Sequence, residues 1–265
     1  TEDAYAFVSG PTMVEEFTGI AVTTDELGGP TTHARQSGAA SVVVADVAAA
    51  VEWVDALLQF VPDNVDNLPT FQPTGDDDNR PTPEAGELMP TTSTGSYDVR
   101  KVIRAIADDD YLFEVRERWA ANVITAFITI DGESVGVVAN QPMVLAGTLD
   151  IPASQKAARF VSFCDAFNIP LLTLVDTPGF YPGKDLEWRG MIRHGGLRPA
   201  AGDRKMLPAR EFPGRVLELF LQCRNAVGPD GQAQLRVLHV SKLEDELRRL
   251  RPGGGLFSGT PHRYR

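Results

Sequence analysis

The sequence holds little cysteine, which limits the disulfide and metal chemistry open to it. Only Cys164 and Cys223 occur among 265 residues, too few for a disulfide framework or for a zinc site made of cysteine alone. No apolar run approaches the roughly 18 residues of a membrane-spanning helix. The first four residues form neither the basic nor the apolar part of a signal peptide. We therefore expect a reduced, cytoplasmic protein that does not enter a membrane.

Basic residues are outnumbered by acidic ones, which disfavours nucleic acid as a partner. The chain has 25 Lys+Arg against 36 Asp+Glu and a net charge of −11, whereas contacts with phosphate need basic surface. The imbalance is uneven along the chain. Residues 1–195 contain 12 basic and 29 acidic residues, but residues 196–265 contain 13 and 7. This change of sign predicts an acidic body followed by a divergent basic tail.

Several motifs that commonly carry chemistry are missing. No His or Cys pair has the spacing of metal ligands, and neither common glycine-rich phosphate motif occurs. The sharp turn that presents a nucleophilic serine is also absent. We predict no metal and assign no catalytic side chain. His33, next to the pair Gly28-Gly29, is expected to bond a backbone carbonyl, and the glycine pair predicts a close backbone approach or positive φ.

The N-terminal part, residues 1–61, has the pattern of a folded piece. We expect a short strand over residues 5–8 and a helix that begins at Pro11. A further helix is expected within residues 38–60, where apolar residues recur at helical spacing. Asp46 is its plausible N-cap.

A proline-rich stretch separates this piece from a second one. Residues 62–97 contain six prolines and the run Asp76-Asp77-Asp78, which predict a linker over the surface. Residues 98–195 then alternate between helical and strand patterns, which is typical of an α/β layer. The expected elements are an amphipathic helix at 98–107, strands at 123–130 and 135–139, a helix at 155–167 and a buried strand at 170–176.

Three predictions for the second piece concern particular side chains. Asp131-Gly132, between the first two expected strands, is a strong hairpin signal. Ser154 is the expected cap of the helix over residues 155–167. Lys156, in the first turn of that helix, is expected to face solvent.

Two loops of the second piece follow apolar strands and are the candidate binding segments. Residues 140–147 and 177–183 are rich in small residues and proline, so their backbone amides can approach a ligand oxygen. Because parallel strands end at the same edge of a sheet, we expect both loops on one edge. A simple strand exit without a function is the alternative from composition alone.

Seven short stretches between residues 5 and 195 occur in a characteristic order. They are 26–33 (ELGGPTTH), 138–143 (VANQPM), 146–150 (AGTLD), 156–160 (KAARF), 164–170 (CDAFNIP), 175–180 (VDTPGF) and 190–195 (GMIRHG). Together they resemble the carboxyltransferase (beta) subunit of biotin-dependent acyl-CoA carboxylases, of the propionyl-CoA and acetyl-CoA carboxylase type.

The resemblance implies a fold, a reaction and a set of partners. The fold is the crotonase-like (ClpP/crotonase) α/β spiral, with residues 1–61 ending one such domain and residues 98–195 beginning the next. The reaction is carboxyl transfer from carboxybiotin to an acyl-CoA, with biotin carried on a biotin carboxylase or carrier partner. The family forms homo-oligomers and uses backbone amides, without a metal, to stabilise oxyanions. The cofactor-binding residues implied here are Gln141, Pro142, Gly147, Pro178, Gly179 and Phe180.

The sequence also departs from the family pattern. The glycine-rich acyl-CoA loop is not found, and no Gly-Gly-Ala-Tyr loop follows Gly195. We therefore expect weak biotin affinity and an incomplete, poorly active chain. A non-catalytic remnant or partner-binding module, and a biotin-dependent acyl-CoA decarboxylase subunit, are the alternatives. For residues 196–265 we predict a shifted reading frame or a fusion, with helices at 216–223 and 243–250.

Overall fold

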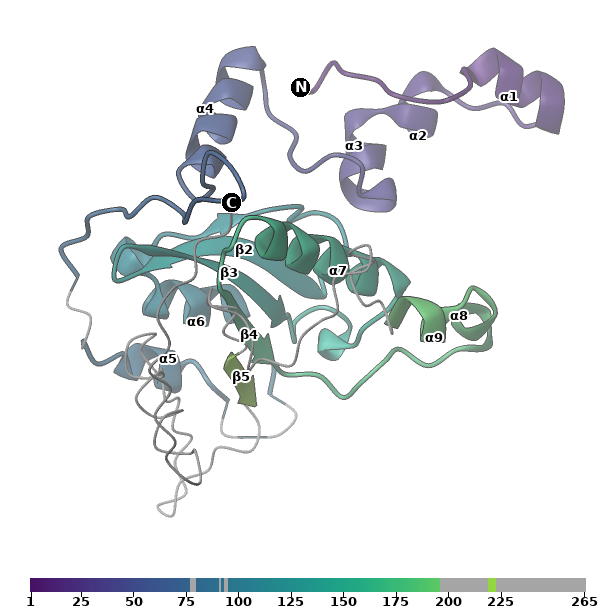
Figure 1. The fold of residues 1–265 in the computed structure, drawn as a ribbon. Coiled ribbons are helices and arrows are strands. Elements are labelled where there is room, and N and C mark those ends of the chain that lie inside the picture. The colour runs from purple at the N-terminus through teal and green to yellow at the C-terminus, as the bar shows by residue number, and fades with distance from the viewer. Residues whose placement is uncertain (77–79, 91, 93–94, 196–218, 223–265) are drawn as a thin grey trace, which may run out of the picture. The chain divides into compact units, whose positions relative to one another are not determined.

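The computed structural model describes residues 1–76, 80–90, 92, 95–195 and 219–222 of the chain (Figure 1). They include a five-stranded sheet in the order β1-β2-β3-β4-β5. Its strands are β1 (Phe113–Glu114), β2 (Val123–Ile130), β3 (Glu133–Asn140), β4 (Leu171–Val175) and β5 (Leu219–Gln222). The pairs β1–β2 and β2–β3 are antiparallel, whereas β3–β4 and β4–β5 are parallel.

The hairpin of β2 and β3 confirms the predicted turn. Ile130 pairs with Glu133, and the two residues between them have positive φ, 54° at Asp131 and 72° at Gly132. Two successive left-handed residues make the tight turn whose twist matches that of the flanking strands. Seven of the eight residues of β2 are buried, so both faces of this strand are covered, unlike a strand with one wet face.

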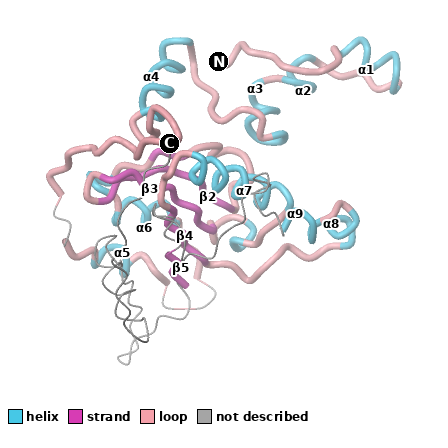
Figure 2. Tube along the Cα trace, viewed as in Figure 1, coloured by secondary structure: helices cyan, strands magenta, loops and turns pink. Residues whose placement is uncertain are grey.

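Helix α7 (Ile151–Ala166) connects β3 with β4 and contacts β2 and β3 (Figures 1 and 2). A parallel pair needs such a crossover. The helix begins four residues before the predicted start, at Ile151. Its N-cap is Asp150, whose Oδ1 accepts the N–H of Ala153 at 2.9 Å. The prediction that Ser154 caps this helix is therefore wrong.

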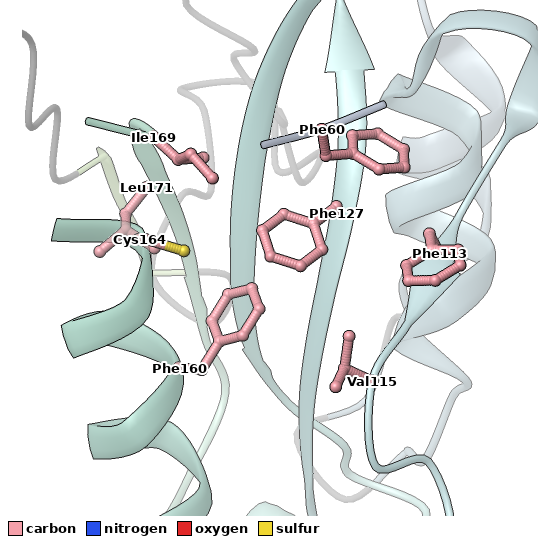
Figure 3. Packing of buried hydrophobic residues seen from close by; sticks show 8 residues of the cluster. All are labelled: Phe60, Phe113, Val115, Phe127, Phe160, Cys164, Ile169 and Leu171. Carbon is pink, nitrogen blue, oxygen red and sulfur yellow. The ribbon is translucent and has the colours of Figure 1, made fainter. Parts of the chain in front are cut away.

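The apolar core between α7 and the sheet is rich in phenylalanine (Figure 3). Phe127 of β2 lies between Phe160 of α7 and Phe60, with ring centroids 4.9 and 5.6 Å away. The remaining buried members are Phe113, Val115, Cys164, Ile169 and Leu171. Phe60 comes from the first predicted piece of the chain, so this core joins residues on both sides of the proline-rich stretch.

The N-terminal region consists of helices, including the one predicted to begin at Pro11 and the one predicted within residues 38–60, and has no strand over residues 5–8. The helices are α1 (Pro11–Thr18), α2 (Thr24–Gly28), α3 (Pro30–Thr32), η1 (His33–Ser37) and α4 (Val47–Leu58). The strand predicted over residues 5–8 is wrong: within the described residues, its one backbone bond to another segment runs from the Ala6 N–H to the Gly28 carbonyl, at 3.0 Å. A Cβ atom on Gly28 would overlap that Ala6 carbonyl. The glycine pair therefore allows two backbone segments to approach closely, which is one of the two roles predicted for it.

Helix α4 has two faces of opposite character. Asp46 caps it, accepting the Ala49 N–H at 2.8 Å, which confirms the predicted N-cap. Trp53 and Leu57 pack against the phenylalanine core. The other face exposes a stripe of large apolar residues, Val47, Val51, Val54 and Leu58. Helical periodicity alone had not shown which apolar residues meet the core.

The remaining helices fall between residues 83 and 195. The stretch predicted as a linker contains α5 (Pro83–Glu87), which contacts α6 (Val99–Ile106). The predicted amphipathic helix is confirmed as α6, whose five buried residues include Val102 and Ile103. The 3-10 turns η2 (Asp108–Asp110) and η3 (Leu145–Gly147) and the helices α8 (Lys184–Trp188) and α9 (Met191–Gly195) complete the set.

The C-terminal predictions are tested only at residues 219–222. These residues form β5, parallel to β4, so the helix predicted over 216–223 is wrong at this point. The helix predicted over 243–250 and most of the basic tail lie outside the described residues. Among the helices that the structure does describe, none is long and apolar enough to cross a membrane.

Candidate functional site

Two loops meet at the edge where β3 and β4 end. We call residues 140–150 the β3 loop and residues 176–183 the β4 loop. Asn140 joins them: its Nδ2 donates to the Gly147 carbonyl at 2.9 Å, and its Oδ1 accepts the N–H of Asp176 at 3.4 Å. One buried amide side chain thus holds the β3 loop closed and fixes the start of the β4 loop.

A short parallel bridge joins the two loops further out. Leu149 pairs with Phe180. The Leu149 N–H donates to the Gly179 carbonyl at 3.0 Å, and the Tyr181 N–H donates to the Leu149 carbonyl at 2.9 Å. The prediction that both loops share one edge of the sheet is confirmed.

The β3 loop contains a left-handed turn of three residues. Leu145, Ala146 and Gly147 have φ of 50°, 51° and 71°. Such a conformation is costly for residues with a Cβ atom and tends to occur where the surrounding structure enforces it, often at functional sites. Leu145 and Ala146 are exposed. Among the described residues, no protein acceptor receives a hydrogen bond from either of their backbone N–H groups.

Gly147 is required at the third position of this turn by space as well as by φ. A Cβ atom there would lie 2.5 Å from the Asp176 carbonyl oxygen, closer than van der Waals contact allows. The two loops therefore approach each other backbone to backbone. Gly147 was among the predicted binding residues. No sequence pattern predicts that Leu145 and Ala146, which precede it, adopt left-handed φ values.

Gln141 and Pro142, two predicted binding residues, are buried at the start of the β3 loop. The Gln141 Nε2 donates to Asp98 Oδ1 at 2.6 Å, and its Oε1 accepts the Val99 N–H at 3.4 Å. The side chain of Gln141 thus ties the loop to the N-terminus of α6. Its contribution to the site is to support the backbone.

Pro178, Gly179 and Phe180, the other predicted binding residues, lie in the β4 loop. The Gly179 N–H donates to Thr177 Oγ1 at 3.1 Å, which holds the loop in a tight turn. Pro178 is exposed, and Phe180 is 53% exposed. One edge of the Phe180 ring packs so closely on Gly195 that a Cβ atom there would lie 2.8 Å from it. The ring is therefore positioned at the site edge while much of its surface stays open.

Lys156 departs most clearly from its prediction. Instead of facing solvent, its side chain is 1% exposed, and its Nζ donates to the carbonyls of Val123 at 2.7 Å and Trp119 at 2.9 Å. Burial lowers the pKa of Lys156 from 10.5 to about 8, and the nearby Glu114 opposes part of this effect. Arg100 binds that same carboxylate through two hydrogen bonds of 2.6 and 2.8 Å.

Sequence reasoning missed Asn122, which precedes β2. Its Nδ2 donates to the Thr148 carbonyl at 2.7 Å, so it contacts the end of the β3 loop. An asparagine before a strand is ordinarily a turn residue. No pattern in the sequence marks it as a neighbour of residues more than twenty positions away.

His33 and Cys164 are held by structural contacts, and a second described histidine, His194, has its Nδ1 3.4 Å from Gln155 Nε2. His33 Nε2 lies 2.6 Å from the Ala6 carbonyl and its Nδ1 lies 2.8 Å from Ser37 Oγ. This confirms the prediction of a bond to a backbone carbonyl. Burial raises the pKa of the Cys164 thiol, which keeps it protonated. No group of three or more possible metal ligands occurs within the described part of the chain.

Comparison with known proteins gives a consistent relationship. Residues 1–197 match the family model described as "Carboxyl transferase domain". The propionyl-CoA carboxylase beta chain of Roseobacter denitrificans is 46% identical over 194 residues, covering 73% of this chain and 38% of that protein. The methylmalonyl-CoA decarboxylase subunit alpha of Veillonella parvula is 44% identical over 190 residues, covering 71% and 37%.

A solved structure shows the same similarity in three dimensions. The transcarboxylase 12S crystal structure, a hexamer with hydrolysed methylmalonyl-coenzyme A bound, superposes with a TM-score of 0.71 and 45% identity. It matches over 73% of this chain and 38% of its own chain. The chain thus spans less than two fifths of the length of the relatives that it matches. By sequence and by mixed α/β fold, this chain belongs to the carboxyl transferase domain family.

Proposed function

We propose that this chain is a carboxyltransferase component that moves a carboxyl group from carboxybiotin to an acyl-CoA, propionyl-CoA or acetyl-CoA. The observation that carries the proposal is the left-handed turn of Leu145 and Ala146 at the joined ends of β3 and β4. It leaves two neighbouring backbone N–H groups available where the two loops meet. Such fixed donors suit a developing oxyanion.

The residues of this edge fit a biotin ring. When bound, biotin supplies a ureido group that carries the carboxyl group and whose oxygen gains negative charge as that group leaves. The N–H groups of Leu145 and Ala146 would donate to such an oxygen. Because they belong to an enforced turn, they need no rearrangement at the moment of reaction.

We assign the binding role to the six residues predicted from the sequence, in two groups. Gln141, Pro142 and Gly147 would shape the turn from behind, since the first two are buried and Gly147 contacts the β4 loop. Pro178, Gly179 and Phe180 would form the facing wall, where the partly exposed Phe180 ring offers a flat apolar surface. We assign no catalytic side chain.

We further propose that the chain contains parts of two crotonase-like domains, residues 1–61 and 98–195, with 62–97 between them and 196–265 as a divergent tail. The end of the family match at residue 197 supports the last boundary. A partner that carries biotin is implied, as is assembly into a homo-oligomer in the cytoplasm. The hexameric transcarboxylase 12S structure supports assembly.

A decarboxylase subunit is the second candidate. The similarity to the methylmalonyl-CoA decarboxylase subunit alpha, at 44% identity, favours it nearly as well. Both reactions would use the same edge, because each transfers a carboxyl group between biotin and an acyl-CoA. A third possibility is a non-catalytic module that keeps the shell of the fold.

The test is an NMR titration of the 265-residue chain with 2-imidazolidinone, which reproduces the ureido ring, and with biotin. Shifts confined to the amides of Leu145, Ala146 and the β4 loop would support the proposal. Gly147→Ala, whose Cβ atom would force the turn away from the Asp176 carbonyl, should abolish them, whereas Gly75→Ala, at an open position, should not. The absence of any shift at millimolar probe would contradict the assignment of this edge.

Release of the carboxyl group of methylmalonyl-CoA as bicarbonate, without an acyl acceptor, would favour the decarboxylase.

A further inference from the structure

Asn122 is a buried residue whose hydrogen bonds all reach the β3 loop or the residue that ends it. Its side chain and backbone are 2% exposed. The Asn122 carbonyl accepts the N–H of Gln141 at 2.9 Å. Its Nδ2 donates to the Thr148 carbonyl at 2.7 Å and lies 3.3 Å from Asp150 Oδ1. A buried amide whose Nδ2 is bonded in this way is costly to replace.

These partners stand on both sides of the left-handed turn. Gln141 is the second residue of the β3 loop, and Thr148 and Asp150 lie at its end. Bonds within the loop set its shape, since Val144 donates to the Gln141 carbonyl and Thr148 to that of Leu145, each at 3.0 Å. Those local bonds cannot fix where the turn sits relative to the sheet. Asn122 fixes both ends from a different segment.

Asn122 is in turn held in place by Lys156. The Lys156 ammonium bonds the carbonyl of Val123 on one side of Asn122 and those of Trp119 and Ala120 on the other, at 2.7, 2.9 and 3.4 Å. Asp150 and Lys156 both belong to the N-terminal part of α7, Asp150 as its N-cap and Lys156 in its second turn. The turn before β2, the β3 loop and α7 are therefore joined through one asparagine.

We propose that Asn122 is a positioning residue of the candidate site. It holds the Leu145–Ala146 turn against the β4 loop so that the two N–H groups stay aimed at a ligand oxygen, and it contributes no chemistry of its own. This inference rests on the proposed function, since that proposal is what assigns a role to those N–H groups.

Amide hydrogen exchange of the full 265-residue chain, without a ligand, tests the positioning role. In Asn122→Ala, the amides of Val144, Gly147 and Thr148 should exchange about tenfold faster, the effect of one lost hydrogen bond. The amides of Phe127 and Val137, in the middle of the hairpin, should be unchanged.

A control separates this effect from the general loss of a bridging side-chain amide, here at a half-buried position. Asn168 also bridges two carbonyls, those of Val65 and Asn67, through its Nδ2. Asn168→Ala removes comparable bonds away from the site. It should leave the exchange of the β3 loop unchanged.

Asn122→Asp adds a readout that a purely stabilising role would not produce. Its carboxylate would face the Thr148 carbonyl and the Asp150 carboxylate, so the β3 loop should exchange faster still at pH 7. Since a neighbouring negative charge raises the pKa of a carboxyl group, protonation near pH 5 should restore a donor. The protection of the loop should then return toward that of the unmodified chain. This comparison of one chain at two pH values carries the test should Asn122→Ala fail to fold.

The outcomes distinguish this inference from the proposed function. Equal acceleration of loop and hairpin amides, or no change in the loop, would overturn the positioning role whatever the chain binds. The third outcome is that protection of the β3 loop depends on Asn122 while the chain binds no ureido ligand. Asn122 would then still position the loop. That result would overturn the proposed function and, with it, the purpose assigned to Asn122.

Discussion

Lys156 is the residue whose charge the fold opposes most. Its pKa falls from 10.5 to about 8, chiefly through burial, so the unfolded chain binds more protons than the folded one between these values. Stability therefore rises with pH across this window and carries a penalty below it. The three carbonyls that surround Nζ compensate the ammonium only in part.

Lys156→Met should remove this dependence on pH. For the unmodified chain, the contribution of Lys156 to the free energy of unfolding should increase by about 3 kcal/mol between pH 7 and pH 11, from the shift in pKa. Urea unfolding at several pH values measures it as the difference between the two chains. A difference that stays constant with pH would show that the ammonium is not buried as described.

Gly147 is the residue most constrained by both conformation and space. Gly147→Ala should lower the free energy of unfolding by at least about 1–3 kcal/mol, because φ is 71° and the Asp176 carbonyl occupies the place of the Cβ atom. Gly75→Ala is the matched control and should have little effect. Thermal unfolding of both variants measures the difference. Equal stability of the two would contradict the close approach of the loops.

At the scale of elements, the start of α7 shows how local signals can point to the wrong residue. Asp150 and Ser154 are both residues that commonly cap helices. Asp150 is the cap, whereas the Ser154 Oγ is buried and without a hydrogen-bond partner in the described structure. Asp150 rather than Ser154 caps the helix because Pro152 is favourable in a first turn and because the β3 loop ends at Asp150.

This difference predicts opposite behaviour for two alanine variants. Asp150→Ala should lower the free energy of unfolding by about 1 kcal/mol, through loss of the cap. Ser154→Ala should leave it unchanged or raise it, because a buried hydroxyl without a partner is costly. Chemical unfolding measures both. A destabilising Ser154→Ala together with a neutral Asp150→Ala would restore the cap inferred from the sequence.

Elements with strong local periodicity could be predicted from the sequence, and the geometry of the site could not. The hairpin at Asp131-Gly132 and helix α6 follow from turn chemistry and amphipathic spacing. The strand expected over residues 5–8 failed because this short apolar run has no neighbouring strand to pair with in the described structure. The loop that carries the Leu145–Ala146 turn is bonded at both ends to a distant residue, Asn122, and no local pattern encodes these contacts.

At the scale of the whole molecule, α4 presents an apolar surface that the described residues leave open. Val51 and Val54 belong to its exposed stripe, whereas Trp53 and Leu57 pack on the phenylalanine core. Val47 and Leu58 extend the stripe by a turn at each end. Exposed apolar stripes of this kind favour association or aggregation.

Substitutions on the two faces of α4 should therefore have different effects. Val51→Lys should change the free energy of unfolding by less than about 0.5 kcal/mol, as is usual at the surface, while reducing self-association in analytical ultracentrifugation. Leu57→Ala should cost about 2 kcal/mol or more. If Val51→Lys destabilised the chain as much as Leu57→Ala, the stripe would be buried rather than exposed.

The parallel pairing of β3 with β4 determines when the candidate site comes into existence during folding. A hairpin such as β2–β3 closes over a short turn within microseconds. The β3–β4 pair must wait until the intervening helix has formed and docked, because distant strands pay a larger loop-closure entropy before their contacts form. A nascent chain that already holds its hairpin would still have no ligand-binding edge. Recognition of biotin or an acyl-CoA would thus report completed folding and not merely secondary structure.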